Sequence, residues 1–149
     1  MAASDEARRM LAKAAEDEYV LDRLLGDPAA PDSMVGFHAQ QAAEKLLKAA
    51  LFLAGVTPPR THNLAGLLDL ADDHGLKPPA ECEELRWLTP YAVLFRYDDE
   101  PDEREEKLAR HEARENLRRL RAWVEQHLAQ ATPDQANDQG GASPQTNQT

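Results

Sequence analysis

Apolar residues recur at helical spacing along most of this chain. The stripe in the first segment consists of Leu11, Ala14, Ala15, Val20 and Leu24. Spacings of three and four residues place such side chains on one face of a helix. Ser4 is positioned to cap this helix, and the Gly-Asp-Pro sequence at 26–28 is positioned to end it. We therefore expect a helix over residues 4–25.

The next segment carries the widest apolar face of the chain. Its members are Phe37, Ala39, Ala42, Ala43, Leu46, Leu47, Ala50, Leu51 and Leu53. This face is wider than a surface helix needs, and its alanines permit close approach by neighbouring helices. We expect a central helix from about Met34 to Ala54, capped by Asp32 or Ser33.

Two shorter helical segments follow a proline corner. Pro58 and Pro59 forbid continuation of the second helix, and Thr61 or Asn63 can cap a third helix over residues 64–74. A fourth segment spans residues 81–97 and contains Pro90, which predicts a kink or two short helices. Its expected inward side chains are Leu85, Leu88, Val93 and Leu94.

The last helical segment is expected from about Asp102 to Gln130. Its inward side chains would be Leu108, Leu117, Leu120, Val124 and Leu128. From Thr132 onward no large apolar residue occurs, so we expect residues 132–149 to be a disordered polar tail. The predicted fold is all-α: residues 1–131 form an antiparallel bundle of four to five helices.

Composition narrows the functional classes. Among 149 residues, 27 acidic and 17 basic side chains give a net charge of −10, which opposes nonspecific binding to nucleic acid or anionic membranes. A single cysteine, Cys82, excludes an intrachain disulfide and a cysteine-rich zinc site. The sequence predicts no metal site and no cofactor, and we expect a cytoplasmic protein without a signal peptide or a membrane span.

Polar residues on the second helix form a candidate ligand-binding edge. These residues are His38, Gln41, Lys45 and Lys48. Lys45 and Lys48, with Arg60 beyond the proline corner, would bind phosphate. Alternatively, the lysines form ordinary salt bridges, for example Lys48 with Glu44.

Two further places carry candidate cations. Arg60 and His62 stand at the start of the third helix, where free N–H groups favour anions, although His62 can equally pack against the corner. Arg96 ends the fourth segment, where it can contact a ligand or pair with neighbouring carboxylates. The fifth helix carries a basic stripe, which is either a phosphate-binding face or part of a solvated charge network. Its members are Arg110, Arg114, Arg118 and Arg121.

These polar residues resemble a known family. The sequence HAQQAAEKLLKA from His38, the break at Gly55, RTHNL from Arg60 and the later Arg96-Tyr97 pair are similar to the HEPN domain of small prokaryotic stand-alone proteins. The resemblance covers roughly residues 4–128. It implies a helical bundle, usually a homodimer, often encoded beside a minimal nucleotidyltransferase as a toxin–antitoxin or nucleotide-binding pair.

The resemblance also bears on catalysis. Ribonuclease members carry an arginine, then four to six intervening residues, then a histidine, and the only run with that spacing near the start of the last large helix is Arg104 to His111. Seven residues span about 10.5 Å of helix, too far for both side chains of one molecule to contact the same phosphate closely. Glu105 also replaces the polar group that usually follows the arginine. A non-catalytic protein is therefore favoured.

The leading hypothesis is a HEPN-like protein that binds a nucleotide or an RNA phosphate through Lys45, Lys48, Arg60, His62 and Arg96. It would act with a minimal nucleotidyltransferase partner. One rival is a ribonuclease toxin that uses Arg104 and His111. The other is a structural dimerisation module without a ligand.

We predict that ending the chain after Ala131 leaves the free energy of unfolding unchanged, because the removed residues have no large apolar side chain to bury. Urea unfolding of the full-length and shortened chains measures this difference. A loss of more than about 1 kcal/mol, close to the burial of one methylene group, would contradict it.

Overall fold

A computed structural model describes residues 2–93 and 107–147, with side chains up to residue 131. The elements are α1 (Ala3–Leu25), α2 (Asp32–Leu53), α3 (Leu64–Asp73), the 3₁₀ helix η1 (Ala80–Ala92) and α4 (Arg110–Asn147). The described residues contain no strand, and the predicted all-α fold is confirmed. No helix in the described parts is long and apolar enough to cross a membrane.

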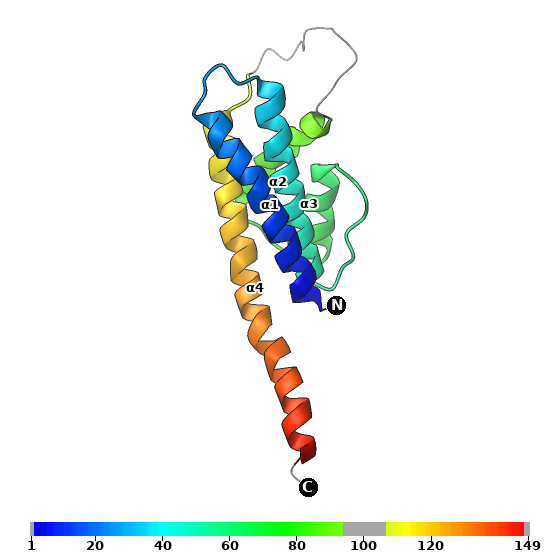
Figure 1. Cartoon of the computed structure of the whole chain (residues 1–149). Helices are drawn as coiled ribbons and strands as arrows, with labels where there is room; N and C mark the ends of the chain where they lie inside the picture. Colours follow the sequence, from blue (N-terminus) through cyan, green and yellow to red (C-terminus); the bar gives the residue numbers. More distant parts are fainter. Residues whose placement is uncertain (1, 94–106, 148–149) are drawn as a thin grey trace.

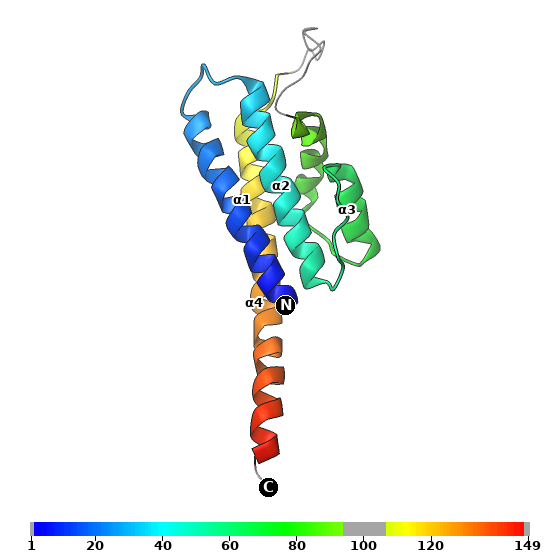
Figure 2. The ribbon, with the colours of Figure 1, turned by 45° about the vertical axis from the view of Figure 1, so that its right-hand side comes forward.

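Helix α2 lies at the centre of the bundle. It packs against α1, α3, η1 and α4, whereas α1, among the described helices, contacts only α2 and α4. Figures 1 and 2 show α1 and α3 on opposite sides of α2, with α4 running alongside the bundle. The apolar face of α2 is buried within the single chain. Ala39, Ala42, Ala43, Leu46 and Leu47 have no exposed surface. The central position predicted for this helix is confirmed.

Helix ends agree with the sequence in part. Asn63 caps α3 as predicted, because its side chain accepts a hydrogen bond from the Gly66 N–H. Ser4 does not cap α1: the cap is Ala2, and Ser4 is buried within the first turn. Asp32 is the first residue of α2 rather than its cap, and its carboxylate binds the start of α4 instead.

Residues 80–92 form a 3₁₀ helix, where the sequence suggested kinked α-helix. The apolar residues that turn inward are Cys82, Leu85, Leu88 and Tyr91. Their spacing is three residues throughout, and a helix with three residues per turn places them all on one face. Val93 was expected inward, but it follows the last turn and is exposed. Leu94 and residues 95–97 lie outside the described part.

Helix α4 begins later than predicted. Lys107–Ala109 are not helical, so the start expected at Asp102 is wrong, while residues 102–106 are outside the described part. Asp32 fixes the true start, because its carboxylate accepts hydrogen bonds from the Leu108 N–H at 3.2 Å and from Arg110 Nε at 2.8 Å. Leu117, Leu120 and Val124 are buried as expected. Helix α4 continues to Asn147, through the segment predicted as a tail, and the disorder of that segment stays a prediction.

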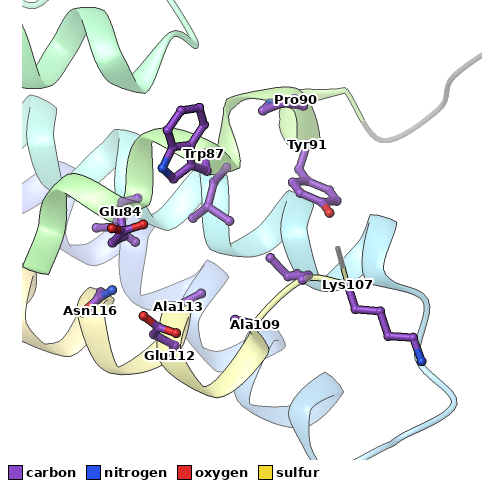
Figure 3. A pocket seen from close by; sticks show the side chains of 12 residues that line it. Glu84, Trp87, Pro90, Tyr91, Lys107, Ala109, Glu112, Ala113 and Asn116 are labelled. Carbon is purple, nitrogen blue, oxygen red and sulfur yellow. The ribbon is translucent and has the colours of Figure 1, made fainter. Parts of the chain in front are cut away.

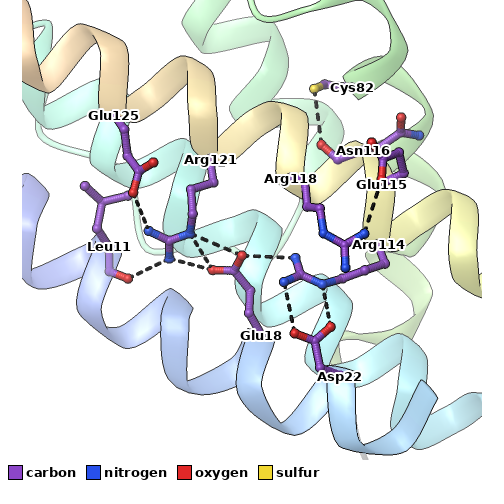
Figure 4. Close-up of polar contacts among 10 residues, drawn as sticks. All are labelled: Leu11, Glu18, Asp22, Cys82, Arg114, Glu115, Asn116, Arg118, Arg121 and Glu125. Carbon is purple, nitrogen blue, oxygen red and sulfur yellow. Dashed lines mark hydrogen bonds and ion pairs between the residues drawn. The ribbon is translucent and has the colours of Figure 1, made fainter. Parts of the chain in front are cut away.

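Most of the basic stripe of α4 forms an internal clamp, in which Arg110, Arg114 and Arg121 bind carboxylates of α1 and α2. Arg114 forms a two-point contact with Asp22, at 2.6 and 3.1 Å, and donates to Glu18 at 3.1 Å. Arg121 binds Glu18 through two nitrogens and donates to the Leu11 carbonyl oxygen at 2.9 Å (Figure 4). Burial would lower the pKa of both arginines, but hydrogen bonds to their carboxylate partners outweigh it and raise the pKa.

This clamp corrects the interpretation of the stripe as a phosphate-binding face. Arg110, Arg114 and Arg121 already bind carboxylates of α1 and α2. Only Arg118 is exposed, and it pairs with Glu115 one turn earlier on the same helix.

We predict that Glu18→Gln lowers the free energy of unfolding by on the order of 3 kcal/mol, because it leaves Arg114 and Arg121 without their shared buried carboxylate. Chemical denaturation measures the loss. Glu115→Gln is the matched control, since it removes a carboxylate from an exposed pair and should cost less than about 1 kcal/mol. Equal losses in the two variants would show that the clamp adds nothing to stability.

Candidate functional site

The candidate site lies where the start of α3 meets the middle of α2. His62 precedes α3 by two residues, and its Nδ1 lies 2.8 Å from Oε1 of Glu44 on α2. The two side chains differ in exposure: Glu44 is 7% exposed, whereas His62 is 67% exposed. A buried carboxylate therefore holds an imidazole ring that faces the solvent.

The side chain of Gln40 holds the backbone of the same histidine. Its Nε2 donates to the His62 carbonyl oxygen at 3.0 Å and to Glu44 Oε1 at 3.1 Å. Gln41 Nε2 in turn donates to Gln40 Oε1 at 2.7 Å. Because Gln40 has no exposed surface, its polar atoms need these internal partners. His62 is thus fixed at two points, ring and main chain.

Glu44 is kept ionised by its neighbours. Burial alone would raise its pKa, but hydrogen bonds from Lys48, His62 and Gln40 outweigh burial and lower the pKa. Lys48 Nζ donates to Glu44 Oε2 at 2.8 Å. The Lys48–Glu44 salt bridge that the sequence offered as an alternative is therefore present.

Ionised Glu44 also sets the tautomer of His62. A carboxylate only accepts hydrogen bonds, so Nδ1 of His62 must be the donor. Nε2 is then the nitrogen available to a ligand, as an acceptor in the neutral ring or a donor in the imidazolium ion. Such a nitrogen can donate to a phosphate oxygen or exchange a proton with one.

Lys45, the other lysine of the α2 edge, belongs to a second cluster of polar side chains. Lys45 Nζ lies 2.5 Å from Asp17 Oδ2, and His38 Nδ1 lies 3.1 Å from Asp17 Oδ1. Asp17 belongs to α1 and is 12% exposed. This cluster therefore joins α1 to α2, and Lys45 is neutralised by a carboxylate rather than presented to solvent.

Arg60 is the accessible cation at this corner. It is exposed and forms no ion pair with the described residues. The start of α3 is less open than the sequence suggested, because the Leu64 N–H donates to Thr89 Oγ1 and the Gly66 N–H donates to Asn63. Arg60 and His62 side chains, rather than free backbone N–H groups, would bind an anion here.

Three predicted site residues remain: Arg96, Arg104 and His111. His111 is exposed in the first turn of α4, while Arg96 and Arg104 lie outside the described part. In the described part of the chain, no group of three or more histidine, cysteine or acidic side chains is placed to hold a metal ion. Cys82 is buried, and burial raises the pKa of its thiol to about 11, so it remains a protonated thiol at neutral pH.

Sequence reasoning missed two residues of these clusters. Asp17 lies three residues after Ala14, a spacing that already indicated an inward position on α1. Gln40 falls between Ala39 and Ala43 on the buried face of α2, where an amide needs an internal partner. Neither spacing identifies the partner, which comes from a different helix or loop.

The sequence model of the HEPN domain family matches residues 28–127, about two thirds of the chain. This range includes α2, α3, η1 and the helical part of α4 that packs on the bundle. No curated protein and no solved structure matches the chain.

We predict that Glu44→Gln destabilises the fold at neutral pH and that its effect shrinks in acid. The lowered pKa of Glu44 means that its stabilising contribution is full above the unfolded-state pKa and is lost as pH falls through the folded-state pKa. Urea unfolding of both proteins between pH 7 and pH 3 measures the difference. Glu16→Gln, an exposed change on α1, is the control. A gap between wild type and Glu44→Gln that stays constant with pH would contradict the role of the charge.

Proposed function

The chain belongs to the HEPN domain family, and on that premise we propose that it binds the phosphate of a nucleotide or an RNA without cleaving it. The binding groups are Arg60 and His62. The observation that carries this proposal is the anchoring of His62: buried Glu44 and Gln40 hold this residue, and its ring remains exposed. Buried polar groups are costly, so their use on one exposed histidine favours a binding role.

The chemistry of the two side chains suits a phosphate. A guanidinium donates two parallel hydrogen bonds to phosphate oxygens, and an imidazolium held by Glu44 donates a third from Nε2. Lys48 is committed to Glu44 at 2.8 Å and supports the site indirectly, by balancing the charge of that carboxylate. Lys45 has no part in this proposal, because its partner is Asp17.

The acidic composition limits the affinity. A net charge of −10 repels a polyanion at long range, so binding must rest on contacts at the corner itself. Exposed ion pairs are screened by salt, and we therefore expect weak binding that tightens at low ionic strength. A long RNA would gain little from the rest of the surface, which favours a nucleotide or a short single-stranded end.

Association with other proteins is a further part of this proposal. A homodimer and a minimal nucleotidyltransferase partner, in a toxin–antitoxin-type pair in the cytoplasm, follow from the family resemblance. The apolar face of α2 is not open to a second copy, because the chain's own helices bury it. A dimer would need another surface.

We predict that Arg60→Ala weakens nucleotide binding by about 1–3 kcal/mol, the range for a charge-assisted hydrogen bond, without changing the melting temperature. Calorimetric titration at low salt measures the affinity. Lys45→Ala is the matched control: it removes a cation that is bound to Asp17 and should leave nucleotide affinity unchanged.

Two substitutions of His62 separate binding from stability. His62→Asn keeps a nitrogen donor near the position of Nδ1, so it should preserve the Glu44 contact while removing Nε2. We expect His62→Asn to lower nucleotide affinity at an unchanged melting temperature. His62→Ala should lower both the affinity and the melting temperature. Unchanged affinity in both variants would remove the histidine from the site.

The ribonuclease rival has its own test. If the wild-type protein cleaves RNA and either Arg104→Ala or His111→Ala abolishes this cleavage, the ribonuclease hypothesis replaces the non-catalytic proposal. If neither nucleotide nor RNA binds at low salt, the structural dimerisation module remains.

A further inference from the structure

A groove runs between η1 and the first turns of α4, away from the His62 corner. Its apolar end encloses about 490 Å³. Leu85, Leu88, Leu108 and Ala113 line it. Trp87 and Tyr91 line it as well (Figure 3). One wall is η1, and the other consists of the non-helical residues 107–109 and the start of α4.

Trp87 is the most exposed large apolar side chain of the described residues. It is 69% exposed because it lies off the face on which every third residue of η1 turns inward. It makes no ring contact with the described residues, whereas Tyr19, 61% exposed on α1, is covered by the Arg23 guanidinium at 4.9 Å. An uncovered indole beside an apolar groove is typical of a binding surface.

The other end of the groove is acidic. It continues into a hollow of about 610 Å³ that Glu81, Glu84, Glu112 and Glu115 line. Glu84 projects from η1 and Glu112 from α4, and neither forms an ion pair with the described residues (Figure 3). The one arginine of this hollow, Arg119, donates to Asn116 at 2.7 Å. Four carboxylates therefore outnumber the two cations that line the groove, Lys107 at the apolar end and Arg119 in the hollow.

We propose that this groove docks a segment of a partner protein in which a large apolar side chain stands next to lysine or arginine residues. The apolar side chain would enter the end beside Trp87, and the cations would lie between Glu84 and Glu112. Complementary charge selects such a segment and excludes a polyanion, whose phosphates the same carboxylates repel. This docking surface is independent of the phosphate corner.

The test uses a defined peptide, acetyl-Leu-Ala-Lys-Lys-amide, and nuclear magnetic resonance of the ¹⁵N-labelled full chain at low salt. We expect shifts of the Trp87 indole and of backbone amides in η1 and the first turns of α4. Two control peptides separate the contributions: Glu in place of both lysines should abolish the shifts, and Ala in place of leucine should weaken binding severalfold.

Matched variants locate the site. Trp87→Ala should weaken binding by about fivefold or more, as expected for the loss of a large apolar contact, whereas Tyr19→Ala should leave it unchanged. The double variant Glu84→Gln with Glu112→Gln should weaken binding and remove most of its salt dependence. All these side chains are exposed, so circular dichroism should show an unchanged fold.

Three results would overturn the proposal. The first is the absence of shifts at millimolar peptide. The second is equal binding of the acidic control peptide. The third is a wild-type dimer in sedimentation that Trp87→Ala converts to a monomer, because the groove would then be occupied by a second copy of this chain. Loss of nucleotide binding in Arg60→Ala has no bearing on any of these outcomes.

Discussion

The structure depends on the position of α2, which contacts every other helix of the described chain. A helix enclosed in this way can carry a polar side chain only if another element supplies a partner. Glu44 meets this condition through Lys48, Gln40 and His62, and no buried side-chain nitrogen or oxygen in the described part lacks a hydrogen bond. The contact between His62 and this buried carboxylate therefore helps to hold the α3 corner against α2.

The same constraint acts between α1 and α4. Glu18 is buried on α1 and is stabilised by Arg114 and Arg121, which fixes the register of one helix against the other. These arginines form ion pairs inside the fold, so their charges do not offset the acidic side chains of the surface. The chain can therefore offer an anion only a local site, and Arg60 is the exposed cation that stands beside an anchored histidine.

The sequence predicted much of the fold because periodicity and capping are local properties. The apolar face of α2 and the Asn63 cap can be identified within a few residues of the chain. Partners across the fold are different: Lys45 was predicted to bind a ligand, and its carboxylate comes from Asp17, 28 residues away. Glu18 carried a usable signal, because it continues the stripe of Ala7, Leu11 and Ala14 and so had to be buried and paired. The three-residue spacing of the apolar side chains in η1 was a second such signal, since it equals the period of a 3₁₀ helix.

Helix η1 lies between the two surfaces for which we propose ligands of opposite charge. On one side Thr89 accepts a hydrogen bond from the first N–H of α3, next to the corner that Arg60 and His62 form. On the other side Trp87 and Glu84 line the groove between η1 and α4. Thr89 lies only two residues from Trp87, but Thr89 contacts the start of α3 whereas Trp87 lines the groove. The two proposed ligands would not compete, because the anion would use Arg60 and His62 and the basic segment would use Glu84 and Glu112.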